Sequence, residues 1–180
     1  MPQNVLIIST SPRKNSNSDA LAEAFAEGAR SAGHRVEIIS LRDKTINFCK
    51  GCLTCQKTHR CIQHDDADTI AQKMLFADVL CFATPVYYYA VCGQMKTMLD
   101  RANPLFSANY AFRKVYLLAT AADETPSAMD GVLKDMEGWV ACFPECRIAG
   151  MVRGTGVINA GDIKSKIMLL RESYELGHDC

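Results

Sequence analysis

The sequence lacks an excess of either charge, a long apolar segment, internal repeats and any linker rich in proline, glycine or serine. Lysine and arginine together number 20, and aspartate and glutamate also number 20, so the formal net charge is zero. A chain without a net electrostatic field does not attract polyanions, which argues against nucleic acid or an acidic membrane as a partner. The absence of linkers and repeats predicts a single domain over residues 1–180.

The apolar run near the N-terminus is short. It covers only residues 5–8, follows the polar Asn4 and has no basic segment before it. Such a run is too short for the core of a signal peptide or for a membrane span. We therefore expect the protein to remain in the cytoplasm. In that reducing compartment the nine cysteines are expected to act as thiols, metal ligands or redox groups rather than as a disulfide framework.

Short apolar runs rich in β-branched residues alternate along the chain with longer segments of helical period. The expected strands cover residues 5–9, 35–41, 78–84, 114–120 and 146–152, and the expected helices cover residues 18–33, 65–75, 92–103, 127–143 and 162–176. This alternation is typical of βαβ units around a parallel sheet. It predicts an α/β fold, a doubly wound three-layer sandwich with a five-stranded parallel sheet. Ligands of such sheets bind beyond the carboxyl ends of the strands.

The loop after the first strand, STSPRKNSNSDAL at residues 9–21, is dense in hydroxyl and amide groups. Arg13 adds a fork of N–H donors, and the helix expected to begin near Ser18 presents unpaired backbone N–H groups to the loop. A phosphate monoester needs these groups. Because neither G-x-x-x-x-G-K-[ST] nor G-x-G-x-x-G occurs, a nucleoside triphosphatase and a dinucleotide-binding fold are disfavoured. The alternative is a polar loop in which Ser18 only caps a helix.

Three consecutive tyrosines, Tyr87, Tyr88 and Tyr89, follow Pro85 just beyond the third strand. Three adjacent side chains cannot all face a core, so at least one is expected to face solvent or a planar ligand. A heteroaromatic ring is the partner that such side chains favour. The alternative is a structural turn.

The segments STSPRKNSNSDAL and TPVYYYAVCGQMKTMLDR together resemble the NADPH-dependent FMN reductase family of the flavodoxin-like superfamily. The segment CKGCLTCQKTHRC, followed by two aspartates, resembles the iron–sulfur flavoproteins of that family. The resemblance implies a flavodoxin-like fold, bound FMN, and NAD(P)H as the donor of hydride to flavin N5. It also implies a small-molecule or protein electron acceptor, and a homodimer or homotetramer in which a neighbouring subunit helps to cover the flavin. The cofactor carries the chemistry, so no catalytic side chain is expected.

The resemblance assigns FMN to three loops. The first loop holds the phosphate, and the second and third lie against the isoalloxazine ring. Ser16 stands where the family more often has glycine, and the third loop reads TAADETPS where the family usually has glycines. The residues carried over are Ser11, Arg13, Ser16, Asn17 and Ser18, then Pro85, Val86, Tyr87 and Tyr88, and finally Thr120, Ala121 and Ala122.

Four cysteines, Cys49, Cys52, Cys55 and Cys61, lie within thirteen residues in the spacing C-x2-C-x2-C-x5-C. The first three resemble the run that holds three corners of a [4Fe–4S] cluster in bacterial ferredoxins. Interleaved basic residues offset the negative charge that thiolates bring to a cluster. Zinc sites more often use two separated pairs of ligands. Three alternatives stay open: a [4Fe–4S] cluster, zinc, or metal-free thiols, which in cluster-free relatives include a disulfide of the Cys49–Cys52 type.

Two acidic residues, Asp65 and Asp66, are expected to begin a helix rather than to act as an acid–base pair. Asp100 and Arg101 are expected to form a structural or intersubunit pair. The other cysteines are expected to lie in the core, except for one in a disordered tail; the core set is Cys81, Cys92, Cys142 and Cys146, and the tail residue is Cys180. The rival function is a flavin-free, flavodoxin-like binding or redox-sensing module that is switched by its cysteine loop.

Overall fold

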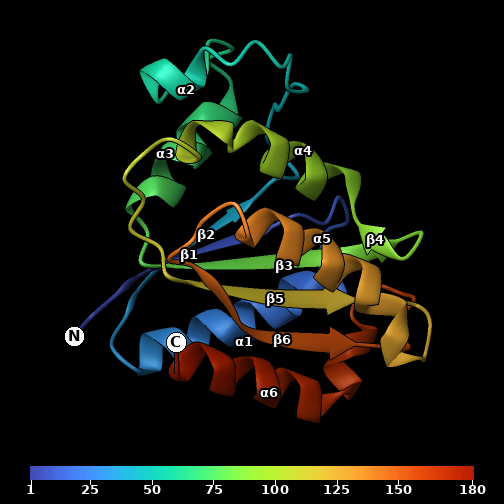
Figure 1. Cartoon of the computed structure of the whole chain (residues 1–180). Helices are drawn as coiled ribbons and strands as arrows, with labels where there is room; N and C mark the ends of the chain where they lie inside the picture. The colour runs from blue at the N-terminus through green and yellow to red at the C-terminus, as the bar shows by residue number, and fades with distance from the viewer.

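A parallel sheet lies between two layers of helices in the computed structural model, which describes residues 1–180 (Figure 1). The strand order is β2-β1-β3-β5-β6, and every neighbouring pair on this path is parallel. This arrangement confirms the predicted doubly wound α/β sandwich. The five strands are β1 (Asn4–Ser9), β2 (Arg35–Ser40), β3 (Val79–Tyr87), β5 (Lys114–Thr120) and β6 (Arg147–Gly154).

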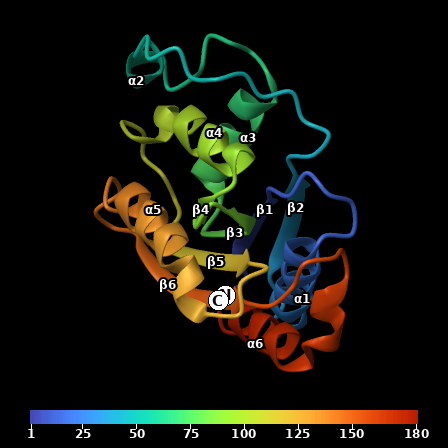
Figure 2. The same cartoon turned by 90° about the vertical axis from the view of Figure 1, so that its right-hand side faces the viewer.

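Helices cover both faces of the sheet, as Figure 2 shows, and they fall into two groups by the core cluster to which they contribute. The first pair is α1 (Asn17–Ser31) and α6 (Ile167–His178), and the second group is α3 (Asp66–Phe76), α4 (Gly93–Arg101) and α5 (Asp130–Val140). Short 3-10 helices cover Asn103–Leu105, Pro126–Met129 and Asp162–Ser165, and a single-turn helix α2 covers Cys55–Thr58. None of the helices combines the length and apolarity that crossing a membrane requires.

The core has two parts because each central strand is buried on both faces. Leu6 and Ile8 of β1 belong to a cluster of 28 buried residues under α3, α4 and α5. Val5 and Ile7 belong to a cluster of 16 buried residues under α1 and α6. Successive side chains of a β-strand point to opposite faces of the sheet, so β1 contributes residues to both core clusters.

Glycines let α1 and α6 approach each other closely. A Cβ atom at Gly28 would lie 2.0 Å from the carbonyl oxygen of Tyr174, and one at Gly177 would lie 2.0 Å from the carbonyl oxygen of Phe25. The close approach carries the C-terminus onto the second core cluster, where Cys180 is buried. The expectation of a disordered tail at Cys180 is therefore wrong.

The remaining cysteines partly follow the prediction. Cys81 and Cys92 are fully buried, as expected. Cys142 is exposed and Cys146 is only partly buried, so the expected core position of Cys142 is wrong. The reason is that α5 ends at Val140, before the predicted end of that helix, and Cys142 lies in the turn that follows.

A hairpin extends the third strand beyond its predicted end. The two-residue strand β4 (Ala90–Val91) runs antiparallel to β3 and pairs with Val86 and Tyr87. Tyr88 and Tyr89 form the turn with φ angles of 50° and 61°, a left-handed conformation that bulky residues rarely adopt. This turn lies at the carboxyl end of β3, next to the loops that follow β1 and β5.

Candidate functional site

A cavity of about 210 Å³ opens where the loops after β1, β3 and β5 meet. The predicted FMN-binding residues line it, except for Tyr88 and Ala121. Two further lining residues, Ile158 and Ala160, come from the loop after β6 and were not predicted. Neither residue carries a chemical signature in the sequence, and glycines at 154, 156 and 161 signal only that a loop follows the fifth predicted strand. The full lining is Ser11, Arg13, Ser16, Asn17, Ser18, Pro85, Val86, Tyr87, Thr120, Ala122, Ile158 and Ala160.

The first loop ends in a helix start that leaves backbone donors free. Ser16 caps α1: its hydroxyl accepts from the N–H of Asp19, and its own N–H donates to the Asp19 carboxylate. The N–H groups of Asn17 and Ser18, in the first turn, have no acceptor in the protein. Ser16 has φ −69° and ψ 161°, so a non-glycine residue fits there without strain, and the left-handed position falls to Asn15.

Two side chains of this loop hold the loop after β6. The Arg13 guanidinium donates from Nη1 to the carbonyl oxygen of Ile158 at 2.9 Å. The Asn17 amide donates to the carbonyl oxygen of Asn159 at 2.9 Å and accepts from the N–H of Ile163 at 3.1 Å. The side-chain amide of Asn17 thus uses both its N–H and its oxygen within the protein, so the backbone N–H of Asn17 is the group that remains available to a ligand. Arg13 is exposed and retains further N–H donors.

The second loop presents an aromatic surface at the rim of the cavity. All three tyrosines are exposed, but only Tyr87 lines the cavity, while Tyr88 points fully into solvent. The turn is held from behind, because the Tyr89 carbonyl packs so closely on Gly131 of α5 that a Cβ atom there would lie 2.1 Å away. A strained turn that is fixed by its neighbours is a common feature of binding sites.

The third loop enters the site through Thr120 and Ala122. Ala121 between them is buried: its N–H donates to the carbonyl oxygen of Gly154, and its carbonyl accepts from the N–H of Val157. These bonds tie the loop after β5 to the loop after β6. The structure therefore gives Ala121 a structural place beneath the cavity.

A buried contact beneath the cavity joins the first two loops. Thr10 donates from both its N–H and its hydroxyl to the carbonyl oxygen of Ala83, each at 2.9 Å. Its hydroxyl also lies 3.2 Å from the Cys92 thiol, and the Cys92 N–H donates to the Thr84 hydroxyl at 3.4 Å. Cys92 is the residue before α4, so this helix begins directly under both loops.

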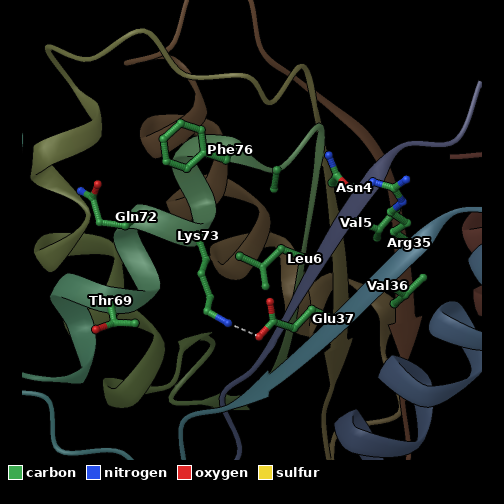
Figure 3. Close-up of a pocket in the computed structure, with 11 residues that line it drawn as sticks. Asn4, Val5, Leu6, Arg35, Val36, Glu37, Thr69, Gln72, Lys73 and Phe76 are labelled. Carbon is green, nitrogen blue, oxygen red and sulfur yellow. Dashed lines mark hydrogen bonds and ion pairs between the residues drawn. The ribbon is translucent and has the colours of Figure 1, made fainter.

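A larger groove of about 540 Å³ lies at the other end of the strands (Figure 3). It is lined by the first halves of β1 and β2 and by α3, with the Lys73–Glu37 ion pair and the exposed Phe76 at its surface. Its shape follows from the position of β2 at the edge of the sheet. The smaller cavity is the better candidate site because ligands of doubly wound sheets bind at the carboxyl ends.

The cysteine loop passes over α3 and α4, away from the sheet (Figure 1). Cys49 and Cys52 are exposed, whereas Cys55 is buried and Cys61 is partly buried. No three cysteine, histidine or acidic side chains come together as a group that could hold a metal ion. Metal binding by all four cysteines therefore requires a rearrangement of this loop.

Hydrogen bonds nevertheless act on all four thiols, and the Gly51 N–H donates to Cys49 Sγ at 3.4 Å. The Asn103 amide donates to Cys55 Sγ at 3.2 Å, and the Arg101 guanidinium donates to Cys61 Sγ at 3.2 Å. Hydrogen bonds from the backbone N–H and the hydroxyl of Thr54 lower the pKa of the Cys52 thiol. Donors of this kind favour a sulfur atom that carries negative charge.

A buried ion pair anchors the cysteine loop. Arg101 is 1% exposed and binds both carboxylate oxygens of Asp65, each at 2.7 Å. It also donates to the Asn47 carbonyl oxygen at 2.7 Å, and its Nε has no partner. Asp65 begins α3 as predicted, because it accepts from the N–H of Ala67. Asp100 pairs with Lys96 instead, so Asp100 and Arg101 do not form a pair with each other.

The electrostatics of Asp65 follow from these contacts. Burial raises the pKa of the Asp65 carboxyl, but the bonds from Arg101 and from the Asn47 N–H outweigh burial and lower that pKa to about 2. Nearby, buried Asp68 accepts from Arg60 and from the Cys61 N–H at 2.9 Å. Burial raises the pKa of the Asp68 carboxyl too, but the bonds from Arg60 and from the Cys61 N–H outweigh burial and lower that pKa.

The strand order β2-β1-β3-β5-β6 defines a flavodoxin-like fold. The chain belongs to the NADPH-dependent FMN reductase family, whose model matches residues 3–146. This match confirms the resemblance that the loop sequences indicate.

Two curated relatives and one solved structure illustrate the similarity. An iron–sulfur flavoprotein of Archaeoglobus fulgidus is 38% identical over 94 residues, which are 52% of this chain and 43% of that protein. Another from Methanocaldococcus jannaschii is 39% identical over 101 residues, 56% of this chain and 52% of that protein. The chain thus spans about half the length of these relatives. An azoreductase from Bacillus anthracis shares the fold, with a TM-score of 0.74 at 17% identity over 99% of this chain and 100% of that one.

The Asp65–Arg101 pair gives a first prediction. Its stabilisation is present above the unfolded pKa of about 4 and is lost as the pH falls towards about 2, because the folded-state pKa is the lower one. Asp65→Asn leaves a buried guanidinium without its counter-charge and is expected to cost about 3–5 kcal/mol at neutral pH. The difference from wild type in the free energy of unfolding, measured by urea denaturation, should narrow on acidification to about pH 3.

Asp100→Asn is the matched control, because Asp100 lies next to Arg101 in the chain but forms an exposed pair with Lys96. Its cost should stay below about 1 kcal/mol. Equal and small costs for both variants would show that the buried pair does not anchor the fold.

Proposed function

We propose that the chain binds FMN across the three loops and passes electrons from NAD(P)H through the flavin to a small-molecule or protein acceptor. The observation that carries this proposal is the convergence of the predicted residues of all three loops on one cavity at the carboxyl ends of the strands. Family membership supports the reaction class. Without this convergence, the polar residues of the loops would be equally consistent with an ordinary solvent-exposed surface.

The first loop fits a phosphate. The free N–H groups of Asn17 and Ser18 stand at the start of a 15-residue helix, where the helix dipole favours an anion. Arg13 provides further donors, and Ser11, Ser16 and Ser18 provide hydroxyls at the same cavity. Apolar groups of Pro85, Val86 and Tyr87 from the second loop and of Ile158 from the fourth suit a flat ring.

The chain's own residues bind and orient the cofactor, which supplies the hydride chemistry when bound. Arg13 and the N–H groups of Asn17 and Ser18 would hold the phosphate, and Val86 and Tyr87 would fix the ring. Arg13 and Tyr87 are the ionisable side chains among the lining residues. This composition supports the expectation that no side chain acts as a catalytic acid or base.

We further propose a [4Fe–4S] cluster held by Cys49, Cys52, Cys55 and Cys61. The four cysteines supply the ligand type of such a group in a ferredoxin-like spacing, and the loop would rearrange to bring their sulfur atoms together. A cluster would supply one-electron transfer beside the two-electron flavin. The names of the two relatives above support the same assignment.

Exposed apolar side chains surround the cavity. Tyr87, Tyr88, Tyr89 and Ile158 form an exposed apolar rim around the cavity, and such patches mark interaction surfaces. We assign this rim to a homodimer or homotetramer contact that helps to cover the flavin.

A cytoplasmic location is supported by nine free cysteines, and zero net charge disfavours nucleic acid and membrane partners.

Flavin titration tests the FMN proposal. The purified chain should bind FMN with a yellow spectrum and then oxidise NADPH or NADH. Arg13→Ala removes a charge-assisted bond to the phosphate worth about 1.5–3 kcal/mol, so FMN affinity should fall roughly ten- to hundred-fold. Riboflavin, which lacks the phosphate, should bind both proteins alike. Lys14→Ala is the control, since Lys14 is exposed and does not line the cavity.

Two outcomes would contradict this account. Failure to bind any flavin would leave the flavin-free redox-sensing module as the function. Equal weakening of FMN and riboflavin by Arg13→Ala would remove the phosphate assignment while leaving the ring assignment intact.

Anaerobic reconstitution tests the cluster. The wild-type chain should contain about four iron atoms and about four acid-labile sulfides. Cys52→Ala should lose most of both, whereas Cys142→Ala should keep them, because Cys142 is an exposed cysteine outside the loop. Less than about one iron per wild-type chain would leave metal-free thiols, and zinc in place of iron would establish a structural zinc loop.

A further inference from the structure

We propose that Arg42 determines the preference of the site for a phosphorylated flavin, because it offsets the charge of Asp19 and so lets the start of α1 accept a phosphate. This inference rests on the proposed function and concerns its first loop. Arg42 lies two residues beyond the end of β2 and does not line the cavity. It acts through Asp19, so it is a positioning residue.

The Asp19 carboxylate lies directly behind the first loop. Its oxygens accept from the Ser9 hydroxyl and from the Ser16 N–H, the latter at 3.3 Å. Ser16 lines the cavity, whereas Asp19 lines a separate groove of about 800 Å³ that Ser16 also borders. A single residue therefore separates the carboxylate from the proposed phosphate position.

The carboxylate and a phosphate would compete for the same helix start. An acidic side chain in the first turn is stabilised by the helix dipole and by the backbone N–H groups there. The capping box between Ser16 and Asp19 is complete without Arg42, so helix capping does not require the arginine. A phosphate at the N–H groups of Asn17 and Ser18, however, would be repelled by a nearby carboxylate whose charge is not offset.

The loop after β2 brings a positive charge to Asp19. This loop is fixed on β1, because the Leu41 N–H donates to the Ser9 carbonyl oxygen at 2.8 Å. From there Arg42 Nη2 reaches the Asp19 carboxylate at 2.7 Å, and the two side chains are 22% and 21% exposed. Arg42 Nε is buried without a partner, which is unfavourable for a donor. Hydrogen bonding alone therefore does not explain this arginine, whereas its charge beside Asp19 does.

Flavin titration of Arg42→Gln tests this role. The variant should bind FMN about three- to tenfold more weakly than wild type, because an uncompensated carboxylate then repels the phosphate, while riboflavin affinity stays unchanged. Adding Asp19→Asn should restore the ratio of FMN to riboflavin affinity to within about twofold of the wild-type ratio. Arg42→Lys keeps the charge and should keep that ratio.

Two matched controls separate this local effect from a change in net charge. Arg35→Gln removes an exposed arginine at the other end of β2 and should leave both affinities unchanged. Glu23→Gln removes an exposed carboxylate one turn further along α1, and adding it to Arg42→Gln should not restore FMN affinity. General destabilisation of the first loop would weaken both flavins alike, so the affinity ratio reports phosphate recognition.

A wild-type affinity ratio in Arg42→Gln would overturn this role, and so would a lowered ratio that Asp19→Asn does not restore. If Arg42→Gln does not fold, Asp19→Asn alone decides: the ratio should rise above the wild-type value, and no rise overturns the role. A wild-type chain that binds FMN and riboflavin equally well removes the phosphate assignment itself. One that binds neither flavin removes the proposed function.

Discussion

The parallel pairing of β1, β3 and β5 is the constraint on which the site depends. Parallel strands that are buried on both faces must all leave the sheet at the same edge, and here three successive loops meet there. The doubled hydrogen bond from Thr10 to the Ala83 carbonyl fixes the first loop against the second just beyond the paired strands. The helix start at Ser16 then directs free N–H groups of the next turn to the cavity without any glycine-rich motif.

A second constraint acts on the other side of α4. The cysteine loop, residues 49–61, keeps its apolar side chains out of the core: Leu53 within it and Phe48 and Ile62 at its two ends are exposed. A buried guanidinium and a buried carboxylate hold it instead. Breaking such a pair typically costs about 3–5 kcal/mol because one charge is left uncompensated. The loop is thus fixed at its base by charge, while Cys49 and Cys52 remain accessible.

Local patterns and one topological rule were sufficient to predict the layers of the fold and most of the cavity lining. The five apolar runs identified the strands, and the carboxyl-end rule brought the loops at Arg13, Val86 and Ala122 to one place. The hairpin was missed because no local signal places two tyrosines in left-handed conformations. The loop after β6 was missed because Ile158 carries no chemical signature.

Long-range pairing was not predictable from one sequence. Arg101 is 36 residues from Asp65 and 40 residues from Cys61, and its neighbour Asp100 was the obvious partner by sequence. Cys180 is buried because Gly28 and Gly177 bring two distant helices together, which no window along the chain reveals. The spacing of the four cysteines predicted their chemistry, whereas their arrangement depends on a loop that follows no periodic pattern.

Amide NMR titration with FMN tests the central claim most directly, because it reports each loop separately. The account predicts the largest shift changes at Ser11, Ser18, Val86 and Ala122, together with Ala160 of the fourth loop. The amides of Glu37, Lys73 and Phe76, in the groove of Figure 3, should remain unchanged. Changes confined to that groove, or none at any of the four loops, would contradict the placement of the flavin at the carboxyl ends of the strands.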